Sequence, residues 1–245
     1  MKLSGNKILI TGATAGIGLA LLEAFLEKDN QIIALGRNEE KLNALASKDA
    51  RIIPFVGDLN QKTCLDELVL FIEQKHPDLN ILINNAGIQY NYHFLEQAHL
   101  TSKIEQEIKV NLIAPIQMIG LLLPTLEQNK NSAIVNVTSG LALAPKMMAP
   151  VYCGTKAGLH IFSQALRYQL DNIKVFEIIP PLVDTAMTAG RGKGKISPQQ
   201  LANEFLQAFK KDTFEVNIGK VKWLKIIQRI SPTLASKIMK GRSSY

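Results

Sequence analysis

Tyr152 and Lys156 are the two side chains whose chemistry and spacing first indicate a reactive site. They lie four residues apart in a segment with helical periodicity, so they share one face of the expected helix. A tyrosine has an ordinary pKa of about 10, and a neighbouring ammonium group favours its phenolate form. The pair is therefore suited to acid–base chemistry near neutral pH. Tyrosine and lysine also meet on exposed helices without any such role, so this spacing alone does not establish a site.

Ser139 adds a hydroxyl group to this pair. It follows a predicted strand and precedes Tyr152 by thirteen positions, and ligands of open α/β sheets bind at the carboxyl ends of the strands. Its hydroxyl can polarise the carbonyl group of a substrate. Thr138 is an adjacent competitor for that role, and either hydroxyl can instead cap the end of the strand.

A glycine-rich segment near the N-terminus has the pattern T-G-x-x-x-G-x-G between a predicted strand and a predicted helix. Gly12 allows a tight turn, Gly16 permits close approach of the backbone to a pyrophosphate, and Gly18 lets the helix pack on the strand. The helix N-terminus offers unpaired N–H groups to the phosphates. The segment predicts a dinucleotide-binding turn made of Gly12, Thr14, Ala15, Gly16, Ile17 and Gly18.

The turn after the second predicted strand indicates which dinucleotide is bound. It reads L-G-R-N at 35–38, with no carboxylate to hold the 2′-hydroxyl of an NAD ribose. Arg37 can pair with the 2′-phosphate of NADP, so we expect NADP(H) to be preferred, with NAD(H) as the alternative. The opposing interpretation is an Arg37 that faces solvent, since Ala15 supplies no second cation. Asp58 and Leu59 are expected beside the adenine, although Asp58 can equally cap a helical turn.

Short apolar segments rich in Ile, Val, Leu and Phe alternate with longer segments of helical period. This alternation predicts repeated βα units and a parallel sheet buried on both faces. The expected strands span residues 7–11, 31–35, 51–56, 81–83, 133–138, 174–179 and 214–218. The expected helices span residues 17–28, 39–47, 61–75, 101–122, 151–170, 198–210 and 221–240, the last interrupted near Ser231 and Pro232.

The chain of 245 residues has 47% hydrophobic and 20% charged residues, which suits a globular α/β protein. We expect residues 1–245 to form one dinucleotide-binding and catalytic domain, with residues 186–245 as a substrate loop and C-terminal helices within it. The two cysteines favour neither a disulfide framework nor a metal site, which indicates the cytoplasm. No secretory signal is expected, and apolar runs such as residues 112–123 are expected to be too short for a membrane span.

The net charge of +7 is concentrated at the C-terminal end, where residues 186–245 hold twelve Lys and Arg but only three acidic residues. Such a surplus suits an acidic substrate, an anionic membrane surface or a nucleic acid, and a solvated polar face is the plainer interpretation. Trp223, Ile226 and Ile227, with neighbouring lysines, also suit peripheral membrane contact. We favour helices that cover the substrate cleft or form an oligomer contact, and we expect no nucleic-acid partner.

Together these motifs resemble the short-chain dehydrogenase/reductase family over most of the chain. The resemblance rests on the glycine-rich turn, N-N-A-G at 84–87, Asn111, Ser139 and Y-C-G-T-K at 152–156, in the family's order and spacing. It implies a three-layer Rossmann fold, a doubly wound parallel sheet of about seven strands with helices on both faces. It also implies a homo-oligomer, a dimer or tetramer built on the long helices near residues 101 and 151.

The resemblance assigns roles to residues that would otherwise attract no attention. Asn85, Ala86 and Gly87 are implied to support the central strand and line the cofactor cleft. Asn111 is implied to hold a water near Lys156 in a proton relay.

One segment departs from the family's pattern. Where the family commonly has P-G-x-x-x-T, this chain has P-P-L-V-D-T at 180–185. Pro181 removes one backbone donor, so cofactor contacts beside Pro180 are expected from Val183 and Thr185. The double proline and the Pro232 tail resemble a branch of oxidoreductases named after D-alanine esterification of teichoic acids.

The function implied is hydride transfer between NADP(H) and a small carbonyl or alcohol substrate, with catalytic residues Asn111, Ser139, Tyr152 and Lys156. Tyr152 exchanges the proton, Ser139 hydrogen-bonds the substrate oxygen and Lys156 stabilises the phenolate. The alternative is a low-turnover NADP(H)-binding regulator or scaffold, with or without peripheral membrane attachment.

No residue pattern identifies the substrate. Residues 141–149 and 186–197 are expected to shape its pocket. Met147 and Met148 are expected to give that pocket an apolar, adaptable wall.

Overall fold

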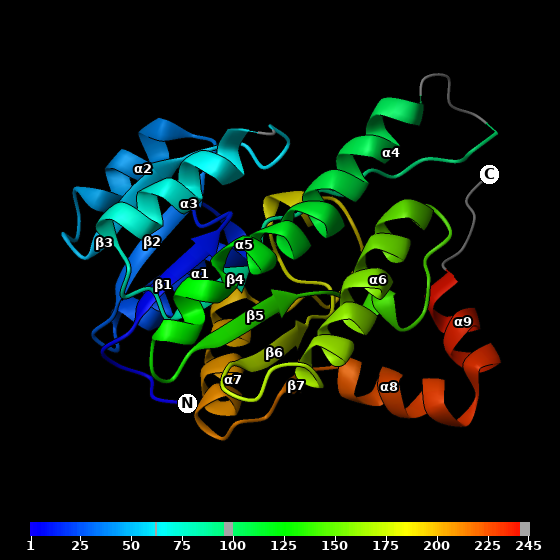
Figure 1. Ribbon diagram of the computed structural model, residues 1–245. Helices are drawn as coiled ribbons and strands as arrows, with labels where there is room; N and C mark the ends of the chain where they lie inside the picture. The colour runs from blue at the N-terminus through cyan, green and yellow to red at the C-terminus, as the bar shows by residue number, and fades with distance from the viewer. Residues whose placement is uncertain (62, 96–99, 241–245) are drawn as a thin grey trace.

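A seven-stranded parallel sheet forms the centre of the protein (Figure 1). The structure, a computed structural model, describes residues 1–61, 63–95 and 100–240. The strands are β1 (Lys7–Thr11), β2 (Gln31–Gly36), β3 (Ile52–Val56), β4 (Ile81–Asn84), β5 (Ala133–Val137), β6 (Lys174–Ile179) and β7 (Glu215–Asn217). Their order is β3-β2-β1-β4-β5-β6-β7, and every neighbouring pair is parallel. The predicted doubly wound sheet is confirmed.

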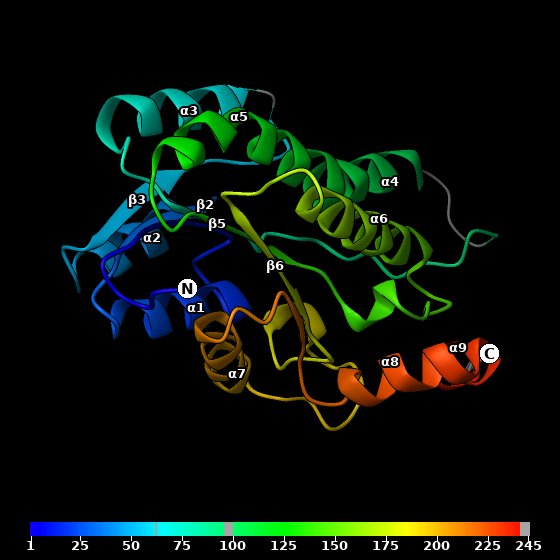
Figure 2. The same ribbon diagram turned by 60° about the horizontal axis from the view of Figure 1, so that its bottom comes forward.

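Helices cover both faces of this sheet (Figure 2). One face packs against α1 (Gly16–Leu26), α2 (Glu39–Ala46) and α7 (Pro198–Lys210), and the other against α3 (Thr63–Lys75), α5 (Ala114–Gln128) and α6 (Pro150–Arg167). The two faces bury separate clusters of aliphatic and aromatic side chains. Strands β4 and β5 are buried along their whole length, which explains why their sequences show no alternation of polar and apolar residues.

The helix predicted at residues 101–122 is longer than expected. α4 (Leu100–Ile108), a π-helical turn (Lys109–Ile113) and α5 follow one another without a break. Pro124 lies inside α5 instead of ending it, and Leu126 beyond it is fully buried in the core. The helix continues past the proline because α5 buries side chains on both sides of it against the sheet.

This continuous helix, Leu100–Gln128, corrects the expectation that every apolar run is too short for a membrane span. It is long and apolar enough to cross a bilayer by length and composition, with a mean hydropathy of 1.4 over an 18-residue stretch within it. Met118, Leu122 and Leu126 pack fully buried in the core on one face of the sheet. An apolar helix packed in the core of a protein passes the same test of length and composition.

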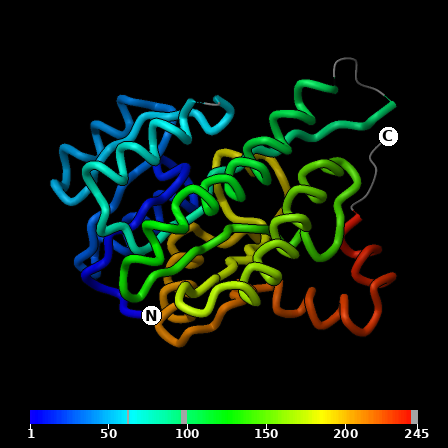
Figure 3. Tube along the Cα trace, viewed as in Figure 1, coloured from blue at the N-terminus to red at the C-terminus, as the bar shows by residue number. Residues whose placement is uncertain are grey.

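Two helices, α8 (Val221–Ile230) and α9 (Pro232–Lys240), lie at the end of the molecule that also carries α6 (Figures 1 and 3). The predicted interruption near Ser231 is confirmed. The Ser231 hydroxyl accepts a hydrogen bond from Leu234 N at 3.3 Å, and Pro232 begins α9, where a proline lacks only an N–H that would be unpaired.

Candidate active site

A cavity of about 1360 Å³ opens at the carboxyl ends of the strands. Residues that follow six of the strands line it: Gly12, Arg37, Asp58, Asn85, Ser139 and Pro180. The strand order reverses between β1 and β4, where sheets of this kind bind ligands. Of the predicted site residues, all line the cavity except Gly18 and Asn111.

The glycine-rich turn forms one wall of the cavity. Gly12 and Gly16 have φ angles of +66° and +57°, a region that other residues rarely adopt. A Cβ atom at Gly18 would lie 2.3 Å from the Gly12 carbonyl oxygen, so Gly18 acts by close packing beneath the turn. Helix α1 has no side-chain cap at Ala15. Its first N–H groups are therefore unpaired and suited to an anionic phosphate.

The end of β2 presents two cations to the cavity. Arg37 lines the cavity with an exposed side chain, and Lys41, near the start of α2, lines it too. The contact of Arg37 with a 2′-phosphate stays a prediction. The Asn38 side chain caps α2 by accepting a hydrogen bond from Lys41 N at 2.7 Å. Sequence reasoning missed Lys41, although its spacing of four from Arg37 at a helix start was the available signal.

Asp58 caps a turn, one of the two roles that the sequence left open, and its contact with an adenine stays a prediction. It lines the cavity beside Leu59, and its carboxylate accepts a hydrogen bond from Asn60 N at 2.9 Å. The carboxylate thus shapes the turn after β3 while one edge of the turn remains open to a ligand.

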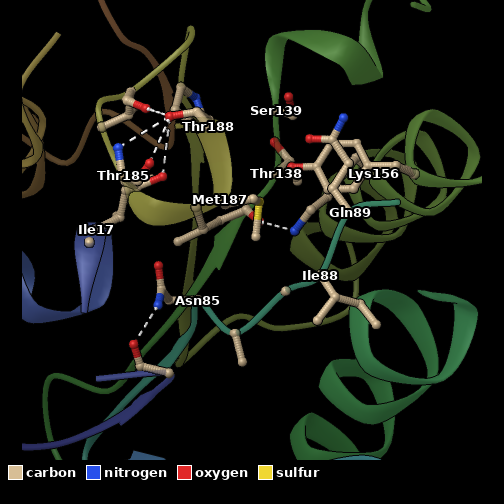
Figure 4. A pocket seen from close by; sticks show the side chains of 18 of the residues that line it. Ile17, Asn85, Ile88, Gln89, Thr138, Ser139, Lys156, Thr185, Met187 and Thr188 are labelled. Carbon is tan, nitrogen blue, oxygen red and sulfur yellow. Dashed lines mark hydrogen bonds between the residues drawn. The ribbon is translucent and has the colours of Figure 1, made fainter. Parts of the chain in front are cut away.

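Asn85 connects the turn after β4 to the turn after β1 by hydrogen bonds. Its side-chain amide donates to the carbonyl oxygens of Thr11 at 2.9 Å and Gly12 at 3.3 Å. The Thr11 hydroxyl accepts from the backbone N–H groups of Asn85 at 3.0 Å and Ala86 at 2.9 Å. Figure 4 shows Asn85 below Thr185, on the same side of the view. These bonds hold two walls of the cavity in a fixed relation.

Ser139, Tyr152 and Lys156 come together on the wall formed by β5 and α6. The Ser139 and Tyr152 side chains both line the cavity, and the Ser139 hydroxyl accepts a hydrogen bond from Leu141 N at 3.1 Å. Lys156 Nζ donates to the Val137 carbonyl oxygen at 2.8 Å and lies 5.8 Å from the centroid of the Tyr152 ring. In Figure 4 Ser139 and Lys156 lie together on one side of the cavity, across from Thr185.

Burial sets the protonation of this pair. It raises the pKa of Tyr152 to about 12, against the lowering effect of the neighbouring Ser139 hydroxyl. It also lowers the pKa of Lys156 to about 8, which the carboxylate of Glu177 partly offsets. The expected lowering of the tyrosine pKa is therefore absent in the protein alone, because desolvation outweighs the lowering effects of Ser139 and of the Arg191 charge. Tyr152 is a protonated acid at neutral pH.

Asn111 lies behind the cavity wall, in the π-helical turn. Its side-chain oxygen accepts from Ile88 N at 2.8 Å, and its amide donates to Ile88 O at 2.8 Å and Thr155 Oγ1 at 3.3 Å. A Cβ atom at Gly87 would lie 3.3 Å from Asn111 Oδ1 and 3.5 Å from Lys156 Nζ. Asn111 thus joins the loop after β4 to α6 close to Lys156, and its role toward a water stays a prediction.

The structure separates the two competing hydroxyls at the end of β5. Thr138 Oγ1 donates to Glu177 Oε1 at 2.6 Å, so this hydroxyl is engaged within the core. Glu177, fully buried in β6, also accepts from His160. Sequence reasoning missed this carboxylate, because it lies in an otherwise apolar strand and its partners come from β5 and α6.

The segment after β6 forms the wall opposite Lys156. Pro180, Val183 and Thr185 line the cavity as predicted, and Thr185 N bonds to the Thr188 hydroxyl at 3.2 Å. The Pro180 carbonyl oxygen accepts from Gly140 N at 2.9 Å, which ties this segment to the one that follows Ser139.

The apolar end of the cavity differs from the prediction. Met147 and Met148 do not line it, because their backbone is held elsewhere: Met147 N bonds to Lys240 O, and Met148 O accepts from Tyr92 N. The apolar wall comes from Leu141, Met187, Trp223, Leu224, Ile227, Ile238 and Met239. The C-terminal helices therefore cover this end of the cavity, as the favoured interpretation of the tail expects.

The chain is similar to known proteins in sequence and in structure. Residues 6–195 match the family described as short chain dehydrogenase. The uncharacterized oxidoreductase DltE of Bacillus subtilis (strain 168) is 36% identical over 233 residues, which cover 92% of each chain.

Two solved structures are similar along nearly the whole chain. A short chain dehydrogenase from Burkholderia cenocepacia J2315 in complex with NADP has a TM-score of 0.88 at 25% identity, with 99% of this chain and 100% of that one covered. A short-chain dehydrogenase from Sphingobium yanoikuyae in complex with NADPH has a TM-score of 0.81 at 23% identity and covers 98% of both chains. The glycine turn, the Ser139–Tyr152–Lys156 wall and these matches agree: the chain is an oxidoreductase of the short-chain dehydrogenase family.

Proposed function

We propose that this protein uses NADP(H) to interconvert a carbonyl group and an alcohol on a small substrate, with Tyr152 exchanging the proton. The observation that carries the proposal is the placing of the Ser139 and Tyr152 side chains on one cavity, with Lys156 buried beside them. Two hydroxyl groups on the same part of a cavity can both hydrogen-bond the oxygen of a substrate carbonyl.

The cavity fits a phosphorylated dinucleotide. The uncapped start of α1 suits its pyrophosphate, and Arg37 and Lys41 together suit a 2′-phosphate, which favours NADP(H) over NAD(H). The relative from Burkholderia cenocepacia, which is in complex with NADP, supports this choice. When bound, the nicotinamide supplies or accepts the hydride.

In the direction of reduction, the protein's own side chains handle the proton and the charge. Ser139 donates a hydrogen bond to the substrate oxygen, and Tyr152, kept protonated by its raised pKa, donates its proton to that oxygen. The protonated form of Lys156 stabilises the phenolate left behind. Asn111 holds the 87–88 segment against α6, which keeps Lys156 in place.

A Tyr152→Phe protein tests the proposal, with Tyr168→Phe as the matched control, since Tyr168 is exposed at the end of α6. We expect Tyr152→Phe to bind NADPH like the unaltered protein but to lose roughly 100- to 10,000-fold in kcat on a carbonyl substrate, while Tyr168→Phe keeps its kcat. Unchanged turnover by Tyr152→Phe would remove Tyr152 from this role. Tight NADPH binding by the unaltered protein, without turnover across a broad screen of carbonyls and alcohols, would instead favour a regulator or scaffold.

A further inference from the structure

The C-terminal helices expose a stripe of large apolar side chains. On α8, Trp223 is 70% exposed, Ile226 50% and Ile230 79%. Their spacing of three and four residues places them along one face of the helix. On α9, Leu234 and Ile238 are about as exposed as Ile226 and are again four residues apart. Exposed apolar residues scattered singly need no explanation, but a continuous stripe does.

The exposure does not result from helices that are detached from the protein. Leu224 and Ala235, on the opposite sides of α8 and α9, are buried and pack with Ala144. Trp223 and Ile238 belong both to the stripe and to the lining of the active-site cavity. The stripe therefore begins at the mouth of the cavity and continues over the outer surface.

The same surface is strongly basic. Lys222, Lys225 and Arg229 follow one face of α8, Lys237 and Lys240 lie on α9, and no acidic residue occurs between residues 216 and 245. Lys222 and Lys225 pair with Glu204 and Glu215 of the preceding elements. Within the described part of the chain, Arg229, Lys237 and Lys240 have no ion-pair partner.

We propose that α8 and α9 dock this protein on an anionic lipid bilayer surface. Exposed apolar side chains beside a row of cations suit the headgroup boundary, where the apolar groups reach the acyl chains and the cations meet lipid phosphates. Trp223 suits this boundary because its ring is apolar and its N–H is polar.

The charged and apolar side chains of this surface argue against two other binding partners, a second copy of the protein and a nucleic acid. Two copies of this surface facing each other would bring unpaired cations together without an opposing carboxylate, which is unfavourable. A nucleic acid would satisfy the cations but would leave the five apolar side chains in water. An anionic bilayer satisfies both features, and docking brings the mouth of the cavity to the lipid.

The full-length protein can be tested with vesicles of phosphatidylcholine, alone or mixed with phosphatidylglycerol. Trp223 is the only tryptophan of the chain, so its fluorescence reports on this surface directly. We expect flotation with the anionic vesicles and a blue shift of the emission, both reversed when salt shortens the Debye length from about 10 Å to about 3 Å. Neutral vesicles should give much weaker binding.

Variants of residues outside the cavity lining separate the contribution of the cations to membrane binding from that of the apolar side chains. The double variant Arg229→Gln/Lys237→Gln should lower the partition coefficient about 25-fold, because the loss of each cation lowers it about fivefold. Ile230→Ser should weaken it roughly tenfold or more. The matched controls are Lys28→Gln/Lys48→Gln and Leu70→Ser, which alter exposed residues of other surfaces and should bind like the unaltered protein.

Circular dichroism establishes that each variant is folded. The absence of both flotation and spectral shift with anionic vesicles would overturn the proposal. Equal losses in the control variants would also overturn it, as would binding of duplex DNA without vesicle binding. A dimer that dissociates on Ile230→Ser, in a protein that does not float, would assign the surface to a second copy instead. None of these outcomes depends on whether Tyr152 is catalytic.

Discussion

His160 Nδ1 lies 2.8 Å from Glu177 Oε1 and 2.9 Å from Glu177 Oε2, inside the core behind the end of β5. The same carboxylate accepts from the hydroxyl of Thr138, the residue next to Ser139, and lies 3.8 Å from a guanidinium nitrogen of Arg167. Glu177 is wholly buried and His160 is 9% exposed. Burying an ionised pair costs desolvation free energy, and this cost is offset only while the two partners stay in contact.

The pair makes stability depend on pH. The hydrogen bond to Glu177 raises the pKa of His160 above its ordinary value of 6.5, against the effect of burial. The native state therefore binds the proton more tightly than the unfolded state does. The stabilisation is fully present below pH 6.5 and is lost as the pH rises through the raised pKa.

We expect His160→Gln to lower the free energy of unfolding by about 3 kcal/mol at mildly acid pH, because the buried carboxylate loses its hydrogen-bonded cation and keeps only Arg167 at 3.8 Å. The difference from the unaltered protein should shrink as the pH rises above 6.5. Urea unfolding of both proteins over a series of pH values measures it. A difference that stays constant with pH would show that His160 is not protonated in the native state.

The buried pair illustrates what the sequence does and does not predict about this fold. The strands were predictable because each is a short apolar run bounded by turn residues, and parallel strands leave this mark. Glu177 was not predictable as a core residue, since a carboxylate in a strand is ordinarily on a surface. Only the tertiary structure shows that Glu177, opposite Asn136 in the register of β6 and β5, meets Thr138 beyond the end of β5 and His160 of α6.

Lys156 gives a prediction for the pH dependence of the reaction. Burial lowers its pKa to about 8, so it loses its positive charge above that pH. We expect kcat/KM for carbonyl reduction to fall above about pH 8, because the phenolate left by proton donation is then no longer stabilised. Tyr152, with a pKa of about 12, remains protonated in this range and is not the cause of the fall.

A Lys156→Arg protein identifies the group responsible, because a guanidinium stays charged throughout this range. Its kcat/KM should be lower overall but should show no break near pH 8. A pH–rate profile of the unaltered protein and the variant, measured at saturating NADPH, makes the comparison. An unchanged break in the variant would assign the titration to another group.

Arg37 and Lys41 give a prediction for cofactor choice. Arg37→Ala should raise the Kd for NADPH roughly tenfold to a hundredfold, since a charge-assisted hydrogen bond contributes about 1.5–3 kcal/mol. Lys41→Ala should have a smaller effect in the same direction. The Kd for NADH, which lacks the 2′-phosphate, is the internal control and should change little. Titrations followed by cofactor fluorescence measure all of these values, and equal losses for the two cofactors would contradict a phosphate contact.

The site was most directly predictable where local sequence determines local geometry. The glycine turn and the spacing of Tyr152 and Lys156 have this property, since each depends on neighbours within one turn or one helix. The apolar wall was predicted wrongly at Met147 because the tertiary contacts of its loop, not its composition, decide where that side chain lies. Lys41 was missed because its cavity position depends on how α2 follows β2.

Gly18 shows how a residue outside the cavity can control binding inside it. A Cβ atom there would lie 2.3 Å from Gly12 O and 2.5 Å from the side-chain amide of Asn85, closer than real contacts allow. Gly12 belongs to the turn that faces the pyrophosphate position, and the Asn85 amide is hydrogen-bonded to that turn, so an added methyl group must push the turn away from α1. The matched control is Gly120→Ala in α5, where the added Cβ meets nothing within 4 Å and alanine is the better helix former.

We expect Gly18→Ala to lose roughly 1–3 kcal/mol of stability, as overpacked positions do, and to bind NADPH and NADH with a common large loss of affinity. The common loss distinguishes displacement of the turn from the selective effect of Arg37, because both cofactors carry the pyrophosphate. Gly120→Ala should be as stable as the unaltered protein or more so, and should bind normally. Thermal unfolding and cofactor titration of the two variants test this. Normal binding by Gly18→Ala would mean that the turn tolerates the methyl group and that its close packing does not position the phosphate-binding backbone.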